Sequence, residues 1–278
     1  MLTIAIPNKG RVQQPVLQML EQIGIKVDVN GGRGLLIPSS KRNVRALLAR
    51  SMDIPLMVER RAADIGFTGE DAVAERGSRV ECVLPLDFGR CKVVLAAPRP
   101  VSVPKSIATT LPNVTKAFCR REGLRADIIT LQGALESAPK LGIAEAIVDQ
   151  METGTTLKEN RLRVLEVIME SRMTIIANGI SLAEKKGQID EIALSAGGLM
   201  AARQRVVLKV NAGSERVRDA LLKLIPAMKS PDVAPLAEPG AYSLLAAVPR
   251  KGLERLIVRI KAAGGTDILV EKPQFIIP

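Results

Sequence analysis

The segment AEAIVDQMETGTTLKEN, residues 144–160, shows most clearly which fold the chain adopts. An apolar run leads to Asp149, a polar turn containing Gly154 follows, and a helical pattern begins at Leu157. A buried strand that leads through a short turn into a helix is the repeating unit of α/β proteins. The segment therefore predicts one βα unit of a parallel sheet.

The same alternation of apolar strands and helical patterns occurs along the chain before this segment. Strands are predicted at residues 2–6 (LTIAI), 63–69 (ADIGFTG), 92–98 (KVVLAAP), 106–110 (SIATT) and 126–133 (ADIITLQG), and helices at about residues 14–23, 115–122 and 136–141. Beyond about Arg203 the patterns occur in the order βαββαβ, with helices expected at about residues 214–224 and 251–263. This is the ferredoxin-like order, so we predict a separate C-terminal domain at residues 203–278.

The composition excludes several classes of protein. A hydrophobic fraction of 47% over 278 residues is sufficient for real cores, so the chain is not disordered. Histidine is absent, and the three cysteines are widely spaced, so neither a disulfide framework nor a structural zinc site is indicated. No run approaches the roughly 20 apolar residues of a membrane-spanning helix, and the N-terminal charges follow the apolar run instead of preceding it. We therefore expect a cytoplasmic protein.

The net charge of +11 indicates a polyanionic partner. Nucleic acid is one such partner, but one tyrosine, four phenylalanines and no tryptophan provide few surfaces on which single-stranded bases can stack. Small phosphorylated substrates fit the charge equally well.

The turn at residues 152–156 has the chemistry of a phosphate-binding loop. Gly154 allows the backbone to approach an anion closely, and the free amides of the following helix point toward it. The threonines around this glycine can add hydroxyl donors. Asp149 and Glu152, just upstream, are placed to hold sugar hydroxyls or a Mg²⁺ ion beside the phosphate. These features suit a phosphorylated ribose, although an ordinary strand, N-cap and helix would have similar residues.

Six motifs together resemble the ATP phosphoribosyltransferase family. Val148-Asp149 followed by TGTTL at residues 153–157 is similar to the phosphoribosyl-pyrophosphate loop of that family. Five further segments are similar to its signatures, in its order and approximate spacing: IPNKGR (6–11), DIGFTGED (64–71), LDFGRCKVVLAAP (86–98), GALESAPKLGIAEAIVD (133–149) and KSPDVAPLA (229–237). The resemblance covers essentially the whole chain.

The resemblance implies a two-domain periplasmic-binding-protein-like (type II) catalytic body plus the C-terminal ferredoxin-like βαββαβ domain. The first catalytic domain comprises residues 1–88 with about 172–202, the second residues 89–171, and residues 203–278 form the regulatory domain of the long form. The implied reaction transfers phosphoribosyl from phosphoribosyl pyrophosphate to N1 of ATP and releases pyrophosphate, the first step of histidine biosynthesis. The family requires Mg²⁺, is feedback inhibited by histidine and usually forms dimers or hexamers. Neither a nucleic acid nor a membrane is an implied partner.

The resemblance also assigns roles to residues. The expected catalytic residues are Asp149, Glu152, Lys9 and Arg11, of which the two carboxylates are also the expected Mg²⁺ ligands, mostly through substrate phosphates. The expected phosphoribosyl pyrophosphate site comprises Asp149, Glu152, Thr153, Gly154, Thr155 and Thr156. The expected ATP site comprises Lys9, Gly10, Arg11, Thr68, Gly69, Asp71, Arg90, Gly133 and Glu136. The expected histidine site comprises Asn211, Ser230 and Asp232.

Simpler interpretations of these positions remain open from the residues alone. Lys9 and Arg11 also fit a solvated basic turn, and Asp71 also fits a helix cap. Arg90 also fits a crossing between domains. Glu136 also fits an exposed glutamate that the first turn of a helix favours.

Two positions depart from the family pattern. Leu111 stands where relatives often carry an aromatic residue before the proline, which puts a stacking role there in doubt. Asp232 stands where the family usually has threonine after Ser230-Pro231, and its carboxylate could change histidine affinity in either direction.

Two other functional classes are alternatives to the enzyme. A non-catalytic small-molecule-binding sensor would bind ligand without releasing pyrophosphate. A nucleic-acid-binding protein is less favoured, because the chain lacks a basic block and a recognition-helix motif.

Overall fold

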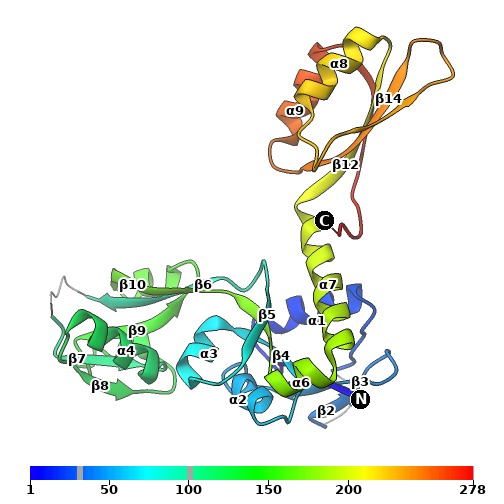
Figure 1. Cartoon of the computed structure of the whole chain (residues 1–278). Helices are drawn as coiled ribbons and strands as arrows, with labels where there is room; N and C mark the ends of the chain where they lie inside the picture. The colour runs from blue at the N-terminus through cyan, green and yellow to red at the C-terminus, as the bar shows by residue number, and fades with distance from the viewer. Residues whose placement is uncertain (30–33, 99–102, 278) are drawn as a thin grey trace. The chain divides into compact units, whose positions relative to one another are not determined.

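The computed structural model describes residues 1–29, 34–98 and 103–277 of the chain. It divides into two compact units, Met1–Ala193 and Leu194–Pro278, and Figure 1 labels the elements of each. Among the described helices, none combines the length and the apolar character needed to cross a bilayer.

The first sheet of the unit Met1–Ala193 has six strands in the order β2-β3-β1-β4-β11-β5. They are β1 (Leu2–Pro7), β2 (Leu36–Pro38), β3 (Val44–Ala49), β4 (Ile65–Gly69), β5 (Glu81–Pro85) and β11 (Met173–Ala177). β1 is parallel to β3 and β4, whereas β11 is antiparallel to β4 and β5. The helices of this part of the chain are α1 (Gln13–Gln22), α2 (Ile54–Glu59), α3 (Glu70–Arg76) and α6 (Gly179–Glu184).

The second sheet of the same unit has five strands in the order β10-β6-β9-β7-β8. They are β6 (Cys91–Ala97), β7 (Ser106–Thr109), β8 (Asp127–Thr130), β9 (Ala146–Met151) and β10 (Arg163–Ser171), and the helical segments are α4 (Pro112–Glu122), the 3₁₀ turn η1 (Leu135–Ser137) and α5 (Thr155–Glu159). β7 is parallel to β8 and β9. All strands of this sheet lie between residues 91 and 171, so it forms from one continuous stretch of chain.

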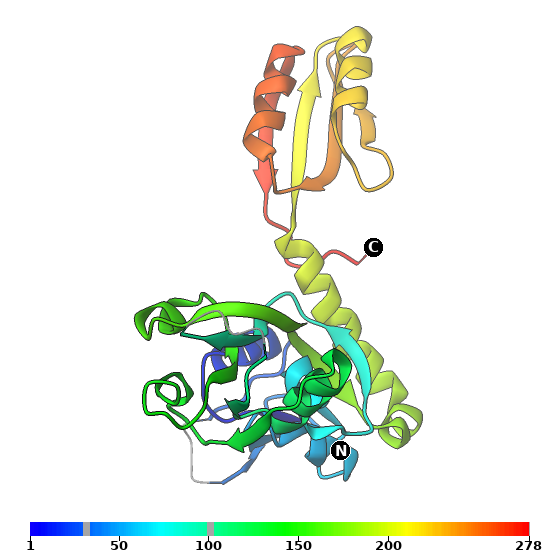
Figure 2. The ribbon, with the colours of Figure 1, turned by 90° about the vertical axis from the view of Figure 1, so that its left-hand side faces the viewer.

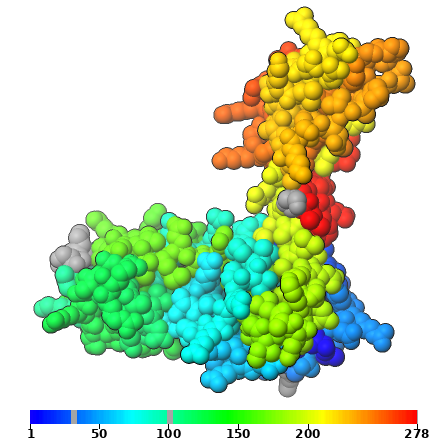
Figure 3. All heavy atoms as spheres, viewed as in Figure 1, coloured from blue at the N-terminus to red at the C-terminus, as the bar shows by residue number. Residues whose placement is uncertain are grey.

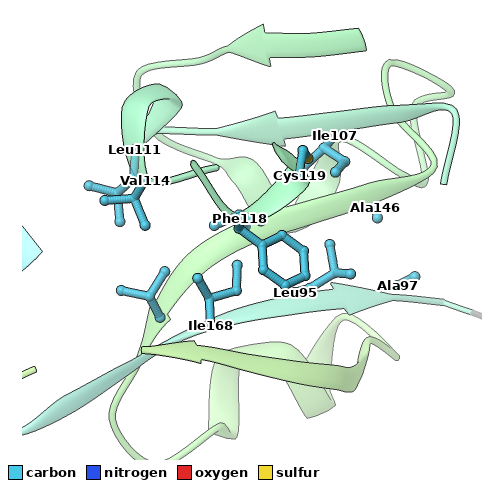
Figure 4. Packing of buried hydrophobic residues seen from close by; sticks show 11 residues of the cluster. Leu95, Ala97, Ile107, Leu111, Val114, Phe118, Cys119, Ala146 and Ile168 are labelled. Carbon is cyan, nitrogen blue, oxygen red and sulfur yellow. The ribbon is translucent and has the colours of Figure 1, made fainter. Parts of the chain in front are cut away.

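Apolar side chains cover both faces of the second sheet. On one face, Phe118 of α4 packs against Leu95 and Ile168, with Leu111 and Val114 at the start of the helix (Figure 4). A second apolar cluster lies on the opposite face of the sheet. It is formed by Val94, Ala96, Ala108, Leu135, Ala138, Ala144, Ile147, Leu157 and Leu162. Successive residues of β6 belong alternately to the two clusters, as expected for a strand that is buried on both faces.

The unit Leu194–Pro278 contains a four-stranded antiparallel sheet in the order β13-β14-β12-β15. Its elements are β12 (Arg205–Ala212), α8 (Glu215–Leu224), β13 (Asp232–Pro235), β14 (Tyr242–Pro249), α9 (Leu253–Ala262) and β15 (Gly265–Glu271). Alternate residues of β12 and β14 pack with Leu221, Leu256 and Ile260 of the two helices. Figure 2 shows both helices against one side of this sheet. α7 (Lys186–Arg203) precedes β12 and contains the division between the two units.

The predicted fold class is confirmed, both for the α/β body and for the ferredoxin-like βαββαβ order of the C-terminal unit. Some local predictions were wrong. The helix predicted at residues 136–141 is only the three-residue turn η1, and α4 begins at Pro112, before the predicted start. α5 begins at Thr155, two residues before Leu157, so Thr155 and Thr156 lie in its first turn.

Candidate active site

The loop at residues 152–156, called the phosphate loop below, connects β9 to α5. Gly154 at its centre has a φ of +77°, a left-handed conformation that glycine adopts without strain. The hydroxyls of Thr153 and Thr155 lie 3.1 Å apart, and Thr156 is also exposed. Hydroxyls and first-turn amides therefore converge at this end of α5, which is the arrangement of an anion-binding loop.

A cavity of about 370 Å³ lies against the phosphate loop. Arg11, Glu136, Asp149, Cys91 and residues 150–157 line it, so the first turn of the chain and two other segments meet at the loop. Arg11 forms an ion pair with Glu152 at 3.0 Å. We call this space the phosphate-loop cavity.

Asp149 and Glu136 share the phosphate-loop cavity. Burial raises the pKa of the Asp149 carboxyl, and the charge of Glu136 raises this pKa further. The backbone N–H of Gln150 donates to the Asp149 carboxylate at 2.8 Å and partly opposes the rise. A carboxylate in such a place gains from hydroxyl donors of a ligand, because they replace the water that burial has removed.

A larger cavity, of about 980 Å³, adjoins the phosphate-loop cavity through Gln150, which lines both. The large cavity is lined by Asn8, Lys9, Gly10, Arg50, Ser51, Met52, Asp53, Glu75, Arg76, Thr110, Leu111, Pro112, Asn113, Thr130, Gln132 and Gln150. Most of its residues lie at or just after the carboxyl ends of β1 and β3 in the first sheet and of β7 and β8 in the second, where ligands commonly bind in α/β proteins.

Most residues of the large cavity were not predicted as site residues from the sequence, and three of them are polar side chains of particular interest. Arg50 directly follows β3, and its exposed guanidinium forms no ion pair with the described residues. Asn8 follows β1, and its buried Oδ1 has no hydrogen-bond partner in the described part of the chain. Gln150 follows Asp149 on β9. The position of Arg50 and Asn8 directly after strands was the signal that could have identified them.

Comparisons with known proteins agree with this geometry. The family model described as ATP phosphoribosyltransferase matches residues 50–196, and the model described as HisG, C-terminal domain matches residues 202–272. A relative from Methanothermobacter thermautotrophicus, named ATP phosphoribosyltransferase, is 37% identical over 100% of this chain and 99% of its own length. A relative of the same name from Saccharolobus solfataricus is 37% identical over 97% of this chain and 96% of its own.

The chain belongs to the ATP phosphoribosyltransferase family. The second matched model identifies the long form, because the C-terminal unit has its own family match. The enzyme transfers phosphoribosyl from phosphoribosyl pyrophosphate to N1 of ATP and releases pyrophosphate, the first step of histidine biosynthesis.

A solved structure supports the fold of this ATP phosphoribosyltransferase. The structure titled ATP phosphoribosyl transferase (HisG:HisZ) complex from Thermotoga maritima is 32% identical and has a TM-score of 0.64. It covers 70% of this chain, which covers 98% of the Thermotoga chain. The similarity is consistent with the expected type II periplasmic-binding-protein-like body.

A third cavity of the ATP phosphoribosyltransferase, of about 430 Å³, contains Arg90. It shares Cys91, Met151 and Glu152 with the phosphate-loop cavity. Burial raises the pKa of the Cys91 thiol, and the nearby charge of Asp71 adds to this shift. Cys91 is therefore a protonated thiol at neutral pH and a poor nucleophile.

Four residues of the predicted ATP site line none of these three cavities: Thr68, Gly69, Asp71 and Gly133. The buried hydroxyl of Thr68 donates to the backbone oxygen of Ser51 at 2.8 Å. Asp71 is 4% exposed, and its carboxylate accepts hydrogen bonds from Ser171 and Gln150.

The residues of the predicted histidine site lie in the C-terminal unit. Asn211 is on β12, Asp232 begins β13, and Ser230 precedes β13. The Asn211 amide nitrogen donates to Asp267 at 3.0 Å, while its buried Oδ1 has no partner among the described residues. Ser230 and Asp232 are exposed.

Proposed function

We propose that the two substrates occupy the two cavities that meet at Gln150. Phosphoribosyl pyrophosphate binds in the phosphate-loop cavity, and ATP binds in the large cavity. The observation that supports this division is that Gln150, adjacent to Asp149, lines both cavities. A transfer between two bound molecules needs such a common boundary, because the reacting atoms must approach to about 3–3.5 Å.

The phosphate loop binds the 5′-phosphate of the ribose in this proposal. α5 has only five residues, so its macrodipole is small, and the local donors supply most of the attraction. These donors are the free amides of the first turn and the hydroxyls of Thr153, Thr155 and Thr156. Asp149 and Glu136 accept hydrogen bonds from the ribose hydroxyls.

Catalysis rests on alignment and on stabilisation of the leaving group. As the lone pair of N1 forms a bond to C1 of the ribose, the bond from C1 to pyrophosphate breaks, and pyrophosphate leaves with its electron pair. The transition state resembles an oxocarbenium ion, so a protein nucleophile is not required. Lys9 and Arg50, which line the large cavity and form no ion pair with described residues, are the cations proposed to meet the triphosphate oxygens of ATP and so to align it for the transfer.

Arg11 and Arg90 add positive charge beside the phosphate loop, since Arg11 lines the phosphate-loop cavity and Arg90 lines the third cavity. Arg11 is already paired with Glu152, whereas Arg90 has no ion pair within the described ranges. We assign Arg11 to the substrate phosphates and Arg90 to the edge of the site. Binding of a phosphate beside Arg11 would release Glu152 for the ribose or for a metal ion.

Mg²⁺ is the proposed cofactor. Asp149, Glu152 and Glu136 line the same cavity, yet the described residues contain no cluster of three or more side chains placed to hold a metal. This sparse set fits Mg²⁺, which proteins usually hold through one or two carboxylates together with substrate phosphates. When bound, Mg²⁺ neutralises charge on the pyrophosphate.

We further propose the domain boundaries and regulation of the long form. The catalytic domains are residues 1–88 with about 172–202 and residues 89–171, and residues 203–278 form a domain that binds histidine as inhibitor. The buried Oδ1 of Asn211, which has no partner among the described residues, is the proposed acceptor for an amino group of that ligand. Ser230, just before β13, and Asp232, its first residue, are the other proposed contacts. The enzyme is a cytoplasmic homo-oligomer, either a dimer or a hexamer.

Pyrophosphate release by the purified protein tests these proposals. Release should require ATP, phosphoribosyl pyrophosphate and Mg²⁺ together, and added histidine should suppress it. Binding of both substrates without release would favour the sensor instead. Light scattering of the same preparation distinguishes a dimer or hexamer from a monomer.

Two variants act as reciprocal controls for the division of substrates. Thr156→Val should raise KM for phosphoribosyl pyrophosphate by about tenfold, because a hydrogen bond to a charged group is worth about 1.5–3 kcal/mol. Lys9→Met should raise KM for ATP by a similar factor. Exchange of these two effects would overturn the division.

A further inference from the structure

Helix α3 carries two buried carboxylates that contact the second sheet and its helix α4. Asp71 is 4% exposed and Glu75 is 6% exposed. The two residues are four positions apart, so they lie on the same face of the helix. Buried carboxylates are rare in proteins unless hydrogen bonds or charges compensate for the lost water, so their partners are informative.

The partners of Glu75 are backbone groups at the start of α4. Its Oε2 accepts hydrogen bonds from the amides of Asn113 and Val114 at 3.0 Å each, and its Oε1 lies 3.1 Å from the Asn113 amide. The Asn113 side chain donates in return to the backbone oxygen of Glu75 at 2.9 Å. The N-cap residue of α4, Leu111, has no side-chain acceptor, so Glu75 performs the capping from another helix.

The partners of Asp71 are side chains at the ends of two strands of the second sheet. Ser171, the last residue of β10, donates to Asp71 Oδ1 at 2.6 Å, and its hydroxyl accepts from the Asp71 amide at 3.1 Å. Gln150 of β9 donates to Asp71 Oδ2. A Cβ on Gly69 would collide with the Asp71 carboxylate, so the start of α3 leaves space for this contact.

Both sets of hydrogen bonds adjoin the proposed meeting point of the substrates. Glu75, Asn113 and Gln150 all line the large cavity, and Gln150 adjoins Asp149 in the phosphate-loop cavity. In Figure 1, α3 lies between the strands of the first sheet and α4 of the second, and Figure 3 shows the cyan atoms of this region against green atoms of the second sheet.

We propose that Asp71 and Glu75 are positioning residues that fix the second sheet against α3 and so hold the phosphate loop in register with the ATP cavity. The hydrogen-bonded junction itself is independent of which substrate occupies which cavity. Its expected effect on catalysis, however, rests on the proposed division of the substrates. Asp71, in this proposal, acts through Gln150 and not by contact with ATP.

Hydrogen exchange tests the junction without reference to substrates. Glu75→Ala should increase the exchange rates of the Asn113 and Val114 amides by about tenfold, the factor that corresponds to loss of a helix cap. Glu75→Gln should keep most of the protection, because an amide oxygen at the Oε2 position still accepts from both. Glu122→Ala, which removes an exposed carboxylate from the other end of α4, is the control and should change neither amide. Unchanged exchange in Glu75→Ala would overturn the junction.

Kinetics test the consequence for catalysis. Glu75→Ala should lower kcat by up to about 100-fold with smaller changes in both KM values, because misalignment of about 1 Å between bound reactants has an effect of this order. Glu75→Gln should restore most of kcat. An increase confined to KM for ATP, with kcat unchanged, would mean that Glu75 binds ATP and would overturn its positioning role.

A parallel variant separates failure of the junction from failure of the substrate assignment. Asp71→Ala should lower kcat in the same way, and circular dichroism should show that the variant remains folded. If the exchange results hold but KM for phosphoribosyl pyrophosphate alone rises in both variants, the assignment of substrates to cavities is wrong and the junction stands. If folded Asp71→Ala has wild-type kcat, Asp71 does not position the site.

Discussion

At the scale of single residues, Asp149 has an environment that opposes its negative charge. Burial and the neighbouring Glu136 raise its pKa, so folding favours the protonated form. The ionised carboxylate therefore reduces stability above the folded-state pKa, and this reduction is absent below the ordinary aspartate value of about 3.9. In the proposed site, Asp149 is thus a ligand-binding group held at the expense of stability, as is common in active sites.

Asp149→Asn should consequently be more stable than the wild type near neutral pH, and the gain should disappear in acid below the ordinary aspartate pKa. Its kcat/KM should fall by about tenfold or more, since under the proposed assignment a ribose hydroxyl loses a charged acceptor. Thermal unfolding across the pH range and pyrophosphate release measure the two effects. Glu159→Gln, a change at an exposed carboxylate on α5, serves as the control. A lower melting temperature of Asp149→Asn at neutral pH would contradict the interpretation.

Asp64 shows the opposite behaviour. Burial alone would raise its pKa, but hydrogen bonds from Lys185, the backbone of Thr3 and Ser181 outweigh burial, and the net pKa is lowered. These donors lie 2.7–2.8 Å from the carboxylate and connect β1 to the region of α6. The stability that Asp64 contributes is thus present above the unfolded-state pKa and is lost as the pH falls through the folded-state pKa.

Asp64→Asn should lower the free energy of unfolding at neutral pH by about 2 kcal/mol, the value of charged hydrogen bonds. The difference from the wild type should shrink as the pH falls below about 4. Asp190→Asn provides a matched control, because Asp190 forms an exposed pair with Lys186 whose value is only about 0.5 kcal/mol. Denaturant unfolding at several pH values measures both variants, and an equal effect of the two would refute the role of burial.

At the scale of elements, the phosphate loop depends on one left-handed residue at the start of α5. Gly154→Ala should cost about 1–2 kcal/mol of stability, because a side chain disfavours this conformation. It should also raise KM for phosphoribosyl pyrophosphate, since the added Cβ lies 3.1 Å from the Met151 sulfur and shifts the loop.

Gly142→Ala separates the two effects of this prediction. Gly142 has a similar φ of +71°, has open space around its Cβ position and lies outside the three cavities. It should lose similar stability with no change in KM. Equal KM values in both variants would show that the loop does not bind this substrate.

Several elements with clear apolar periodicity were predicted from the sequence, whereas β3, whose composition is ambiguous, and the strands β10 and β11 were not. α8 and α9 were found close to their predicted ranges, and Ser214 caps α8 as such a residue should. β3 was missed because VRALLA consists largely of good helix formers. Since β3 was missed, Arg50 at its end was missed as well.

The connections among site residues could not be predicted, because they join positions far apart in the sequence. The phosphate-loop cavity is lined by Arg11, Glu136 and Asp149, which come from three separate segments of the sequence. Asp71 meets Gln150, which is 79 positions away. Local pattern identified the polar character of these residues, but only the packed sheets show which of them line a cavity and which hold the elements together.

At the scale of the whole molecule, the charge of +11 favours association with two polyanionic substrates. The Debye length falls from about 30 Å at 0.01 M salt to about 8 Å at 0.15 M, so long-range attraction weakens strongly over this range. KM for both substrates should therefore rise several-fold with salt while kcat stays nearly constant. Initial rates in chloride and acetate salts measure this, with sucrose as an uncharged control. KM values insensitive to salt would assign binding to short-range contacts alone.

The position of β11 has a consequence for the order in which the chain folds on the ribosome. β4 and β5 are separated in the first sheet by β11, which is synthesised only after all five strands of the second sheet. During translation, the first sheet cannot be completed until residues 173–177 have been synthesised. The second sheet can form earlier, because all its strands lie in the continuous stretch 91–171. The second sheet is therefore expected to fold first. The N-terminal strands of the first sheet are expected to need protection from aggregation until β11 has been synthesised.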